Sequence, residues 1–209
     1  FLTKLKLQAG IRYDYKNIST QETGLPEDME YRSALEKNYG SFSGSMGATY
    51  NLSEFLLFRA NLAAAYRTPN LAELTSNGPH ETRYEVGDPD LVPENSLEGD
   101  VNIHFHKPNY SIDIAGFYNS IQHYIFISPT GDTTVDGMSI FKYMQNDSTL
   151  YGGEDGLHIH PEPLEWLHFE TTFASVIGKQ KNGDYLPFIP AYKLNFELRA
   201  EKEKMAFLH

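Results

Sequence analysis

Residues 41–52, SFSGSMGATYNL, alternate apolar and polar side chains over their whole length. One set comprises Phe42, Met46, Ala48, Tyr50 and Leu52, and the other comprises Ser41, Ser43, Ser45, Thr49 and Asn51. Successive side chains of a β-strand point to opposite faces, whereas a helix repeats about every 3.6 residues. The stretch therefore predicts a strand with one apolar and one polar face.

The same period of two recurs on both sides of this stretch. Residues 4–14 place Leu5, Leu7 and Ile11 opposite polar side chains, and residues 96–106 and 191–199 alternate in the same way. We predict strands at residues 4–15, 39–52, 55–67, 95–107, 110–127, 139–161, 165–178 and 189–201. The predicted fold class is all-β.

The connections between these strands alternate in length. Long connections span 16–38, 68–94, 128–138 and 179–188, and short ones fall at 51–54, 108–109 and 162–164. Long loops on one rim and short turns on the other are typical of an antiparallel up-and-down transmembrane β-barrel, whose short turns are periplasmic. Two alternatives stay open, namely a soluble all-β ligand-binding sandwich and a passive or structural outer-membrane barrel closed by eight strands.

Composition agrees with this prediction and excludes some functions. The 209 residues are 40% hydrophobic, with 14 Tyr, 13 Phe and a mean hydropathy of -0.46. This low mean is compatible with a membrane barrel, because only every second side chain meets lipid. No run approaches the ~20 apolar residues of a spanning helix. The net charge of -11 argues against a nucleic-acid partner, and the lack of cysteine fits an oxidising compartment.

The segment from Ala65 to Ser96, AYRTPNLAELTSNGPHETRYEVGDPDLVPENS, resembles the signature of TonB-dependent receptors. In that family an R-x-P-x-x-x-E-L stretch at a strand end leads into a G-x-H loop, and Y-x-x-G-[ND]-P-x-L-x-P-E-x-S opens the next strand. The matching residues are Arg67, Pro69, Glu73, Leu74, Gly78, His80, Tyr84, Gly87, Asp88, Pro89, Leu91, Pro93, Glu94 and Ser96. GFYNSIQHYIF at 116–126, YGGEDGLHIHP at 151–161 and LPFIPAYKLNFEL at 186–198 resemble later strands of the family, so the resemblance covers nearly the whole chain.

The resemblance implies that residues 1–209 are part of the C-terminal β-barrel domain of such a receptor, in the outer membrane of a Gram-negative bacterium. These receptors import scarce ligands such as siderophore-iron, haem, cobalamin, metals or glycans. The implied partners are outer-membrane lipid, a small-molecule or metal-chelate ligand, the TonB complex and a surface lipoprotein. No cofactor is implied.

The resemblance also implies a larger protein. We recognise no plug domain and no TonB box in these residues, the chain starts inside a strand at FLTKLKLQAG, and MAFLH at 205–209 resembles the start of another strand. Transporter barrels of this type have about 22 strands, so the eight to nine strands expected here form an incomplete barrel. An open sheet exposes two edges. We therefore expect the isolated chain to pair with another copy, to curl into a smaller closed barrel or to require detergent.

The outward loop 68–94 and the strand end before it carry the candidate ligand-binding residues. These are Arg67, Glu73, His80, Glu81, Arg83, Tyr84 and Asp88, a mixture able to contact polar or metal-bearing ligands. The alternative is that such residues shape the loop, since many of them belong to the general family pattern.

Histidines raise a separate hypothesis of metal binding. The pairs His104/His106 and His158/His160 each project both imidazoles to the polar face, and Asp113 lies between them. The pairs are two strands, or roughly 10 Å, apart, so a tight tetrahedral site would need favourable stagger. The alternative is that these histidines line the lumen and bond to a plug.

Motifs for catalysis are missing from the sequence. It contains no GxSxG elbow, no HExxH helix motif and no phosphate-binding glycine loop. We therefore predict binding and transport rather than enzymatic activity.

Overall fold

The computed structural model describes residues 4–28, 30–164 and 166–201. Its long strands are β1 (Leu5–Thr20), β2 (Leu35–Asn51), β3 (Leu56–Arg67), β6 (Glu94–Lys107), β7 (Tyr110–Thr133), β8 (Ser139–Ile159), β9 (Leu167–Gln180) and β10 (Lys193–Ala200). They confirm the all-β prediction and lie at the predicted positions. The further strand expected from MAFLH falls outside the described residues.

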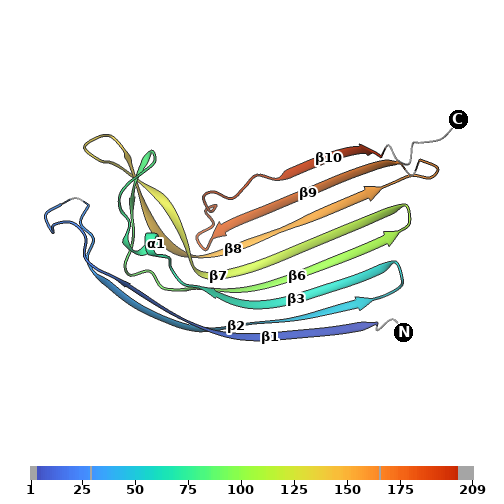
Figure 1. The fold of residues 1–209 in the computed structure, drawn as a ribbon, viewed down its shortest axis with the longest axis horizontal. Helices are drawn as coiled ribbons and strands as arrows, with labels where there is room; N and C mark the ends of the chain where they lie inside the picture. Colours follow the sequence, from blue (N-terminus) through green and yellow to red (C-terminus); the bar gives the residue numbers. More distant parts are fainter. Residues whose placement is uncertain (1–3, 29, 165, 202–209) are drawn as a thin grey trace.

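The long strands form one antiparallel sheet in which each strand pairs with the next long strand along the chain (Figure 1). The register between β1 and β2 is continuous, from Leu5 opposite Tyr50 to Thr20 opposite Leu35, whereas the pairing of β7 with β8 shifts register after Ile121 and after Pro129. Short turns join the strands at one end, where β1 begins and β10 ends, and the longer connections gather at the other end. We call these the turn end and the loop end. The up-and-down arrangement is as predicted.

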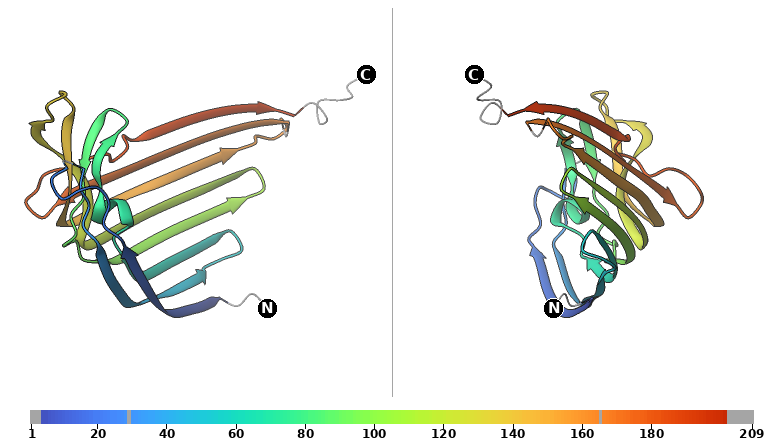
Figure 2. Two further views of the ribbon diagram at one scale, coloured as in Figure 1. Left: turned by 60° about the vertical axis from the view of Figure 1, so that its left-hand side comes forward. Right: turned by 90° about the vertical axis from the view of Figure 1, so that its right-hand side faces the viewer.

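The sheet curves into an open trough (Figure 2). Among the described strands, β1 pairs with β2 alone and β10 with β9 alone, so the two edges do not meet. Of the three outcomes expected for the isolated chain, closure into a smaller barrel is not the one seen in this structure, whereas the predicted incomplete barrel is confirmed. The sandwich alternative requires a second sheet packed against the first, and the described part of the chain contains no such sheet.

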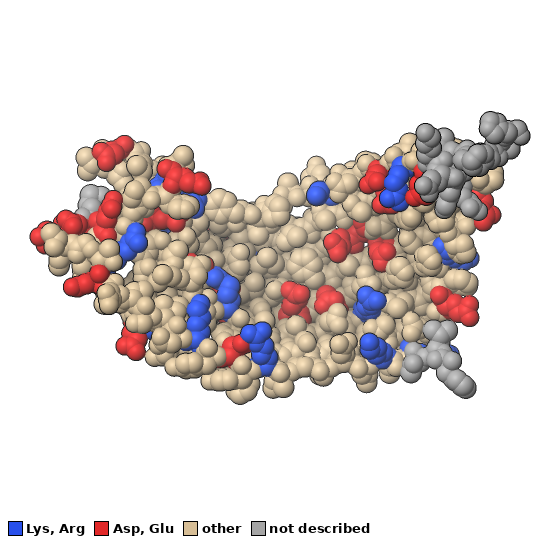
Figure 3. Space-filling model, viewed as in Figure 1, with Lys and Arg blue, Asp and Glu red and all other residues tan. Residues whose placement is uncertain are grey.

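The two faces of the sheet differ in chemistry as the alternation predicts. Apolar side chains on one face are open to the surroundings, with Val101 of β6 59% exposed and Ile11 of β1 81% exposed. The opposite, concave face carries the charged side chains (Figure 3). In a soluble protein the apolar side chains would be buried in a core and the charged side chains would be exposed, which is the opposite of this arrangement. None of the helices among the described residues has the length and apolar character to cross a membrane.

The loop end holds structure that the alternation did not predict. Segment 68–94 contains helix α1 (Leu71–Thr75) and strands β4 (Asn77–His80) and β5 (Arg83–Val86), and β5 pairs in parallel with β8. Elements of four or five residues are too short to show a period. The loop predicted at 128–138 is also wrong, because β7 and β8 stay paired as far as Thr133 opposite Ser139.

A small hydrophobic core explains this extension. Leu74, Leu91 and Ile125 are buried together, with Ile18, Leu35 and Tyr143 packed against them. The core thus joins segment 68–94 to β7, β8 and the outer ends of β1 and β2. The predicted loop 16–38 shortens to 21–34 because β1 and β2 remain paired up to this core.

Candidate functional site

Arg67, at the loop end of β3, is the centre of an ion-pair cluster. Its Nη1 lies 2.9 Å from Oε1 of Glu73, and its Nη2 lies 2.6 Å from Oε1 of Glu94. The Arg67 Nε also donates to Oε2 of Glu94 at 2.9 Å, so the contact with Glu94 is bidentate. Both carboxylates are buried, and pairing with the guanidinium offsets the cost of removing them from water.

Both carboxylates also hold backbone groups of the loop end. Glu73 accepts from the Asn70 amide while Asn70 accepts from the Glu73 amide, which is a capping box at the start of α1. Glu94 accepts a hydrogen bond of 2.7 Å from the Ile125 amide of β7. The cluster therefore connects β3, α1, β6 and β7.

A second cluster surrounds the buried carboxylate of Glu85 on β5. Arg83 approaches it at 2.6 Å, His80 at 3.5 Å and the Tyr143 hydroxyl at 3.2 Å. The Arg83 guanidinium also lies over the Phe141 ring, 5.1 Å from its centroid. The cluster attaches the β4–β5 hairpin to β8.

Tyr84, Asp88 and Glu81 have three different environments. Tyr84 is buried and donates to Asn77 Oδ1 at 3.0 Å. Burial is the main cause that raises the pKa of Tyr84, and the nearby negative charge of Glu30 raises it further. The Tyr84 hydroxyl therefore stays neutral. Asp88 lies 3.9 Å from Lys142. Glu81 is exposed in the hairpin turn with a φ of 53°.

The predicted ligand-binding residues thus do not converge on one site. Arg67 and Glu73 belong to one cluster, Arg83 and His80 belong to another, and Glu81 stands apart in the turn. Of the predicted residues, Arg67, His80 and Glu81 are exposed, whereas the carboxylate of Glu73 is enclosed. Their role as ligand contacts stays a prediction.

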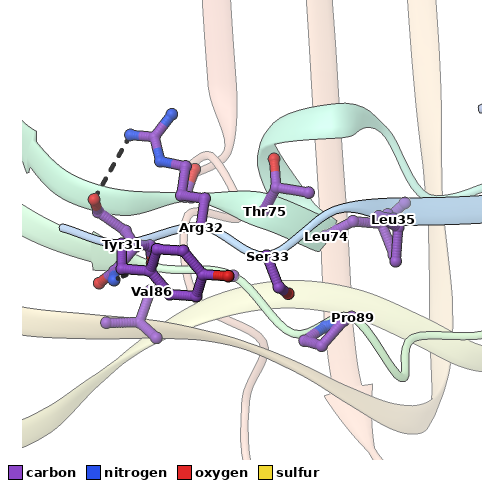
Figure 4. Close-up of a pocket in the computed structure, with 11 residues that line it drawn as sticks. Tyr31, Arg32, Ser33, Leu35, Leu74, Thr75, Val86 and Pro89 are labelled. Carbon is purple, nitrogen blue, oxygen red and sulfur yellow. Dashed lines mark hydrogen bonds between the residues drawn. The ribbon is translucent and has the colours of Figure 1, made fainter. Parts of the chain in front are cut away.

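A cavity of about 200 Å³ lies between segment 21–34 and segment 68–94 (Figure 4). Its lining residues are Tyr31, Arg32, Ser33, Leu35, Leu74, Thr75, Ser76, Asn77, Val86, Gly87 and Pro89. The Arg32 guanidinium lies at the cavity and donates to the Asn77 carbonyl at 3.4 Å. Sequence reasoning missed Tyr31, Arg32 and Ser33, because a period-two pattern does not reveal that two loops distant in sequence meet.

The concave face below the loops carries charges of both signs (Figure 3). Lys6, Arg12 and Arg59 occupy polar positions on β1 and β3, whereas Glu98, Asp100 and Glu154 occupy polar positions on β6 and β8. Asp100 accepts from Asn61 at 2.8 Å and Glu98 accepts from Asn119 at 2.8 Å. Such a face suits contact with water or a polar partner, not with lipid.

The two histidine pairs lie at the turn end of the concave face. His104 contacts Asp113 at 2.7 Å and stacks on His106 with ring centroids 6.1 Å apart. His158 and His160 both contact His168, a residue that sequence reasoning did not select. Within the described residues, no set of three His, Cys, Asp or Glu side chains is arranged to hold a metal ion. Metal binding by the predicted pairs stays a hypothesis.

Comparison with known proteins adds independent information. The model of the family described as TonB dependent receptor-like, beta-barrel, matches residues 1–201. The ferric enterobactin receptor PirA of Pseudomonas aeruginosa is 25% identical over an alignment of 175 residues that covers 76% of this chain and 23% of that protein. The probable TonB-dependent siderophore receptor PirA of Acinetobacter baumannii is 25% identical over 186 residues, 76% of this chain and 24% of that protein.

A solved structure shows the same fold. The copper transporter OprC superposes with a TM-score of 0.81 at 21% identity, covering 97% of this chain and 30% of that one. This likeness concerns the fold alone. The chain spans about a quarter of the length of the curated relatives that it matches.

Proposed function

Because the chain belongs to the TonB-dependent receptor β-barrel family, we propose that it forms part of the transmembrane wall of an outer-membrane importer. The complete receptor takes up a scarce ligand, with energy delivered by TonB. In this proposal the chain serves binding and transport, not catalysis. Its location is the outer membrane of a Gram-negative bacterium.

The two-faced sheet is the observation that carries this proposal. Its apolar face is open along the full length of the long strands, while the opposite face is concave and charged. An outer-membrane barrel has this division, with lipid outside and a polar lumen inside. Placing the short turns in the periplasm directs segments 21–34 and 68–94 to the cell exterior.

A ferric siderophore is the ligand class that the comparisons favour. The names of both curated relatives describe siderophore receptors. We assign ligand contact at the loop end to the cavity beside Arg32 and to the exposed side chains of His80 and Glu81. Arg67, Glu73, Arg83, Tyr84 and Asp88 are assigned mainly to holding the loops in place, because their side chains contact protein groups and are less exposed than the 65% exposed side chain of His80.

The partners of the complete receptor follow from the same proposal. Outer-membrane lipid contacts the apolar face, and a plug domain outside these residues fills the concave face and reaches TonB. A surface lipoprotein is a further partner that could hand over ligand at the loop end. In this proposal the polar residues of the concave face contact the plug, because barrels of this size enclose a plugged lumen.

Uptake of a radiolabelled ferric siderophore tests the proposal. The full-length receptor is expressed in a Gram-negative host that lacks its own siderophore receptors, in strains with and without TonB. We expect saturable uptake only in the strain with TonB. Uptake that is equal in both strains would contradict an energy-coupled importer and favour a passive pore. No uptake of any of several ferric siderophores, with the receptor present at the cell surface, would contradict the ligand class.

A further inference from the structure

Three histidine rings meet at the turn end of β8 and β9, on the concave face. The ring centroids of His158 and His160 are 5.4 Å apart, those of His158 and His168 are 5.3 Å apart, and those of His160 and His168 are 5.5 Å apart. The register explains the meeting, because His158 lies opposite Glu170 and His160 therefore faces His168. The rings form a nearly equilateral triangle.

The size of this triangle matches a metal bound by three imidazoles. A zinc–nitrogen distance of about 2.0–2.1 Å puts each ring centroid roughly 3.2 Å from the metal, and tetrahedral angles then separate the centroids by about 5.2 Å. The observed separations of 5.3–5.5 Å are within a few tenths of an ångström of that value.

Two donor atoms already have a ligating separation. His158 Nε2 and His168 Nδ1 are hydrogen-bonded at 3.1 Å, and two ligands of a tetrahedral zinc ion are about 3.3 Å apart, so a metal ion would replace this hydrogen bond. Glu170 Oε1 lies 3.6 Å from the same His158 nitrogen and can supply an oxygen ligand. Both His158 and Glu170 are about one-third exposed, so an ion can reach them from the concave side.

The other nitrogen of His168 has the surroundings of a metal-bound histidine. Its Nε2 is buried without a hydrogen-bond partner and lies 3.5 Å from Oε1 of Glu201. Histidines that bind metals through one nitrogen usually direct the other N–H to a carboxylate, which fixes the tautomer. With Nδ1 of His168 on the metal, Nε2 carries the proton and Glu201 is the acceptor.

We propose that His158, His160 and His168 bind a divalent first-row transition metal such as Zn²⁺, with Glu170 as a fourth ligand and Glu201 orienting His168. Imidazole and carboxylate ligands in this number suit such ions. No three donor atoms surround one point as the described side chains stand. The site therefore forms on binding, when the hydrogen bond between His158 and His168 opens and the His160 ring rotates toward the two nitrogens.

Arg199 is the cation that a bound metal would displace from the carboxylates. Its Nη2 lies 3.5 Å from Glu170 Oε1, and its Nε lies 3.9 Å from Glu201 Oε1. Arg199 is half exposed, so it can turn away without leaving a buried charge. Its present contacts neutralise part of the negative charge of the metal-free site.

Zinc binding to the complete receptor, purified in detergent, tests this proposal by titration calorimetry. We expect one saturable equivalent of Zn²⁺ that His160→Ala weakens by about 100-fold or more, since loss of a ligand exceeds the ~10–100-fold loss from removing a second-shell partner. The matched control is His123→Ala, which removes an exposed histidine of β7 that belongs to neither histidine pair. It should bind Zn²⁺ as the unchanged receptor does.

His160 is chosen because it is only partly buried, so that its removal leaves the sheet intact. Glu201→Gln keeps the shape of its side chain and should weaken binding by about 10–100-fold. Co²⁺ supplies a spectroscopic signature, because a tetrahedral complex absorbs visible light far more strongly than an octahedral one. Unchanged zinc affinity in His160→Ala, an equal loss in the control, or an octahedral Co²⁺ spectrum would overturn the proposal. None of these results depends on siderophore uptake.

Discussion

Gly87 lies where segment 68–94 folds back on α1. A Cβ added to Gly87 would lie 2.7 Å from the backbone nitrogens of Thr75 and Ser76, and the Gly87 amide donates to the Ser76 carbonyl at 2.6 Å. These neighbours are backbone atoms, which cannot rotate away as a side chain can. The glycine that the sequence signature contains is thus required by a close approach of two chain segments.

We expect Gly87→Ala to loosen segment 68–94 by about 1–3 kcal/mol, the usual cost of overpacking. The measurement is the rate of tryptic cleavage after Arg83 in the complete receptor under native conditions, since proteolysis of a folded segment follows its local opening. Gly78→Ala is the control, because its nearest neighbour is the end of the Arg32 side chain at 3.4 Å. Equal cleavage rates in the two variants would contradict this explanation.

At the residue level, the sequence predicted chemistry better than it predicted contacts. The signature contains Arg67, Glu73 and Glu94, but their spacing in the chain does not reveal that one guanidinium binds both carboxylates. His168 shows the same limit. Its proximity to His158 and His160 depends on the register between β8 and β9, which a single sequence does not specify.

Among the elements, the long strands were predicted well because each has one lipid-compatible face and one polar face. The strand positions agree within a few residues, apart from the extensions at the loop end. The missed elements are α1, β4 and β5, which are short and acquire their structure from contacts with β7 and β8. Local patterns carry little information about such elements, because their stability comes from tertiary contacts.

The Arg67 cluster joins four of these elements, so replacing Arg67 should destabilise backbone hydrogen bonds in elements other than its own strand. We predict that Arg67→Met increases hydrogen exchange at the Ile125 amide by about 5- to 150-fold, equivalent to roughly 1–3 kcal/mol. The reason is that Glu94, which accepts from this amide, loses its bidentate partner.

Hydrogen exchange of peptides covering residues 121–127, read by mass spectrometry, measures this effect. Arg12→Met is the matched control, because Arg12 pairs with Asp14 while its side chain is 75% exposed, and exposed pairs contribute little. Exchange at Ile125 that is unchanged by Arg67→Met would show that the cluster does not hold β7 to the loop end.

In the whole molecule, one layer of sheet separates two environments. The described strands leave most of their apolar side chains open on the convex side and gather most of their Lys, Arg, Asp and Glu on the concave side, with Asp155, opposite Ile114 and Phe173, as an exception. The strands have enough length to cross a bilayer and to continue above it into the loop end. The sheet therefore has the chemistry of a barrel wall, while the loop end and the histidine cluster add local sites to the two rims.

Accessibility of spin labels along β6 tests this central claim most directly. The 209 residues contain no cysteine, so single substitutions at residues 97–104 attach one label each to this part of the receptor. In the complete receptor in liposomes, labels at 97, 101 and 103 should collide readily with oxygen dissolved in lipid, and labels at 98, 100, 102 and 104 should not. A period of two with this phase is the predicted result. Equal oxygen accessibility at both sets, or the opposite phase, would contradict the assignment of the sheet as an outer-membrane wall.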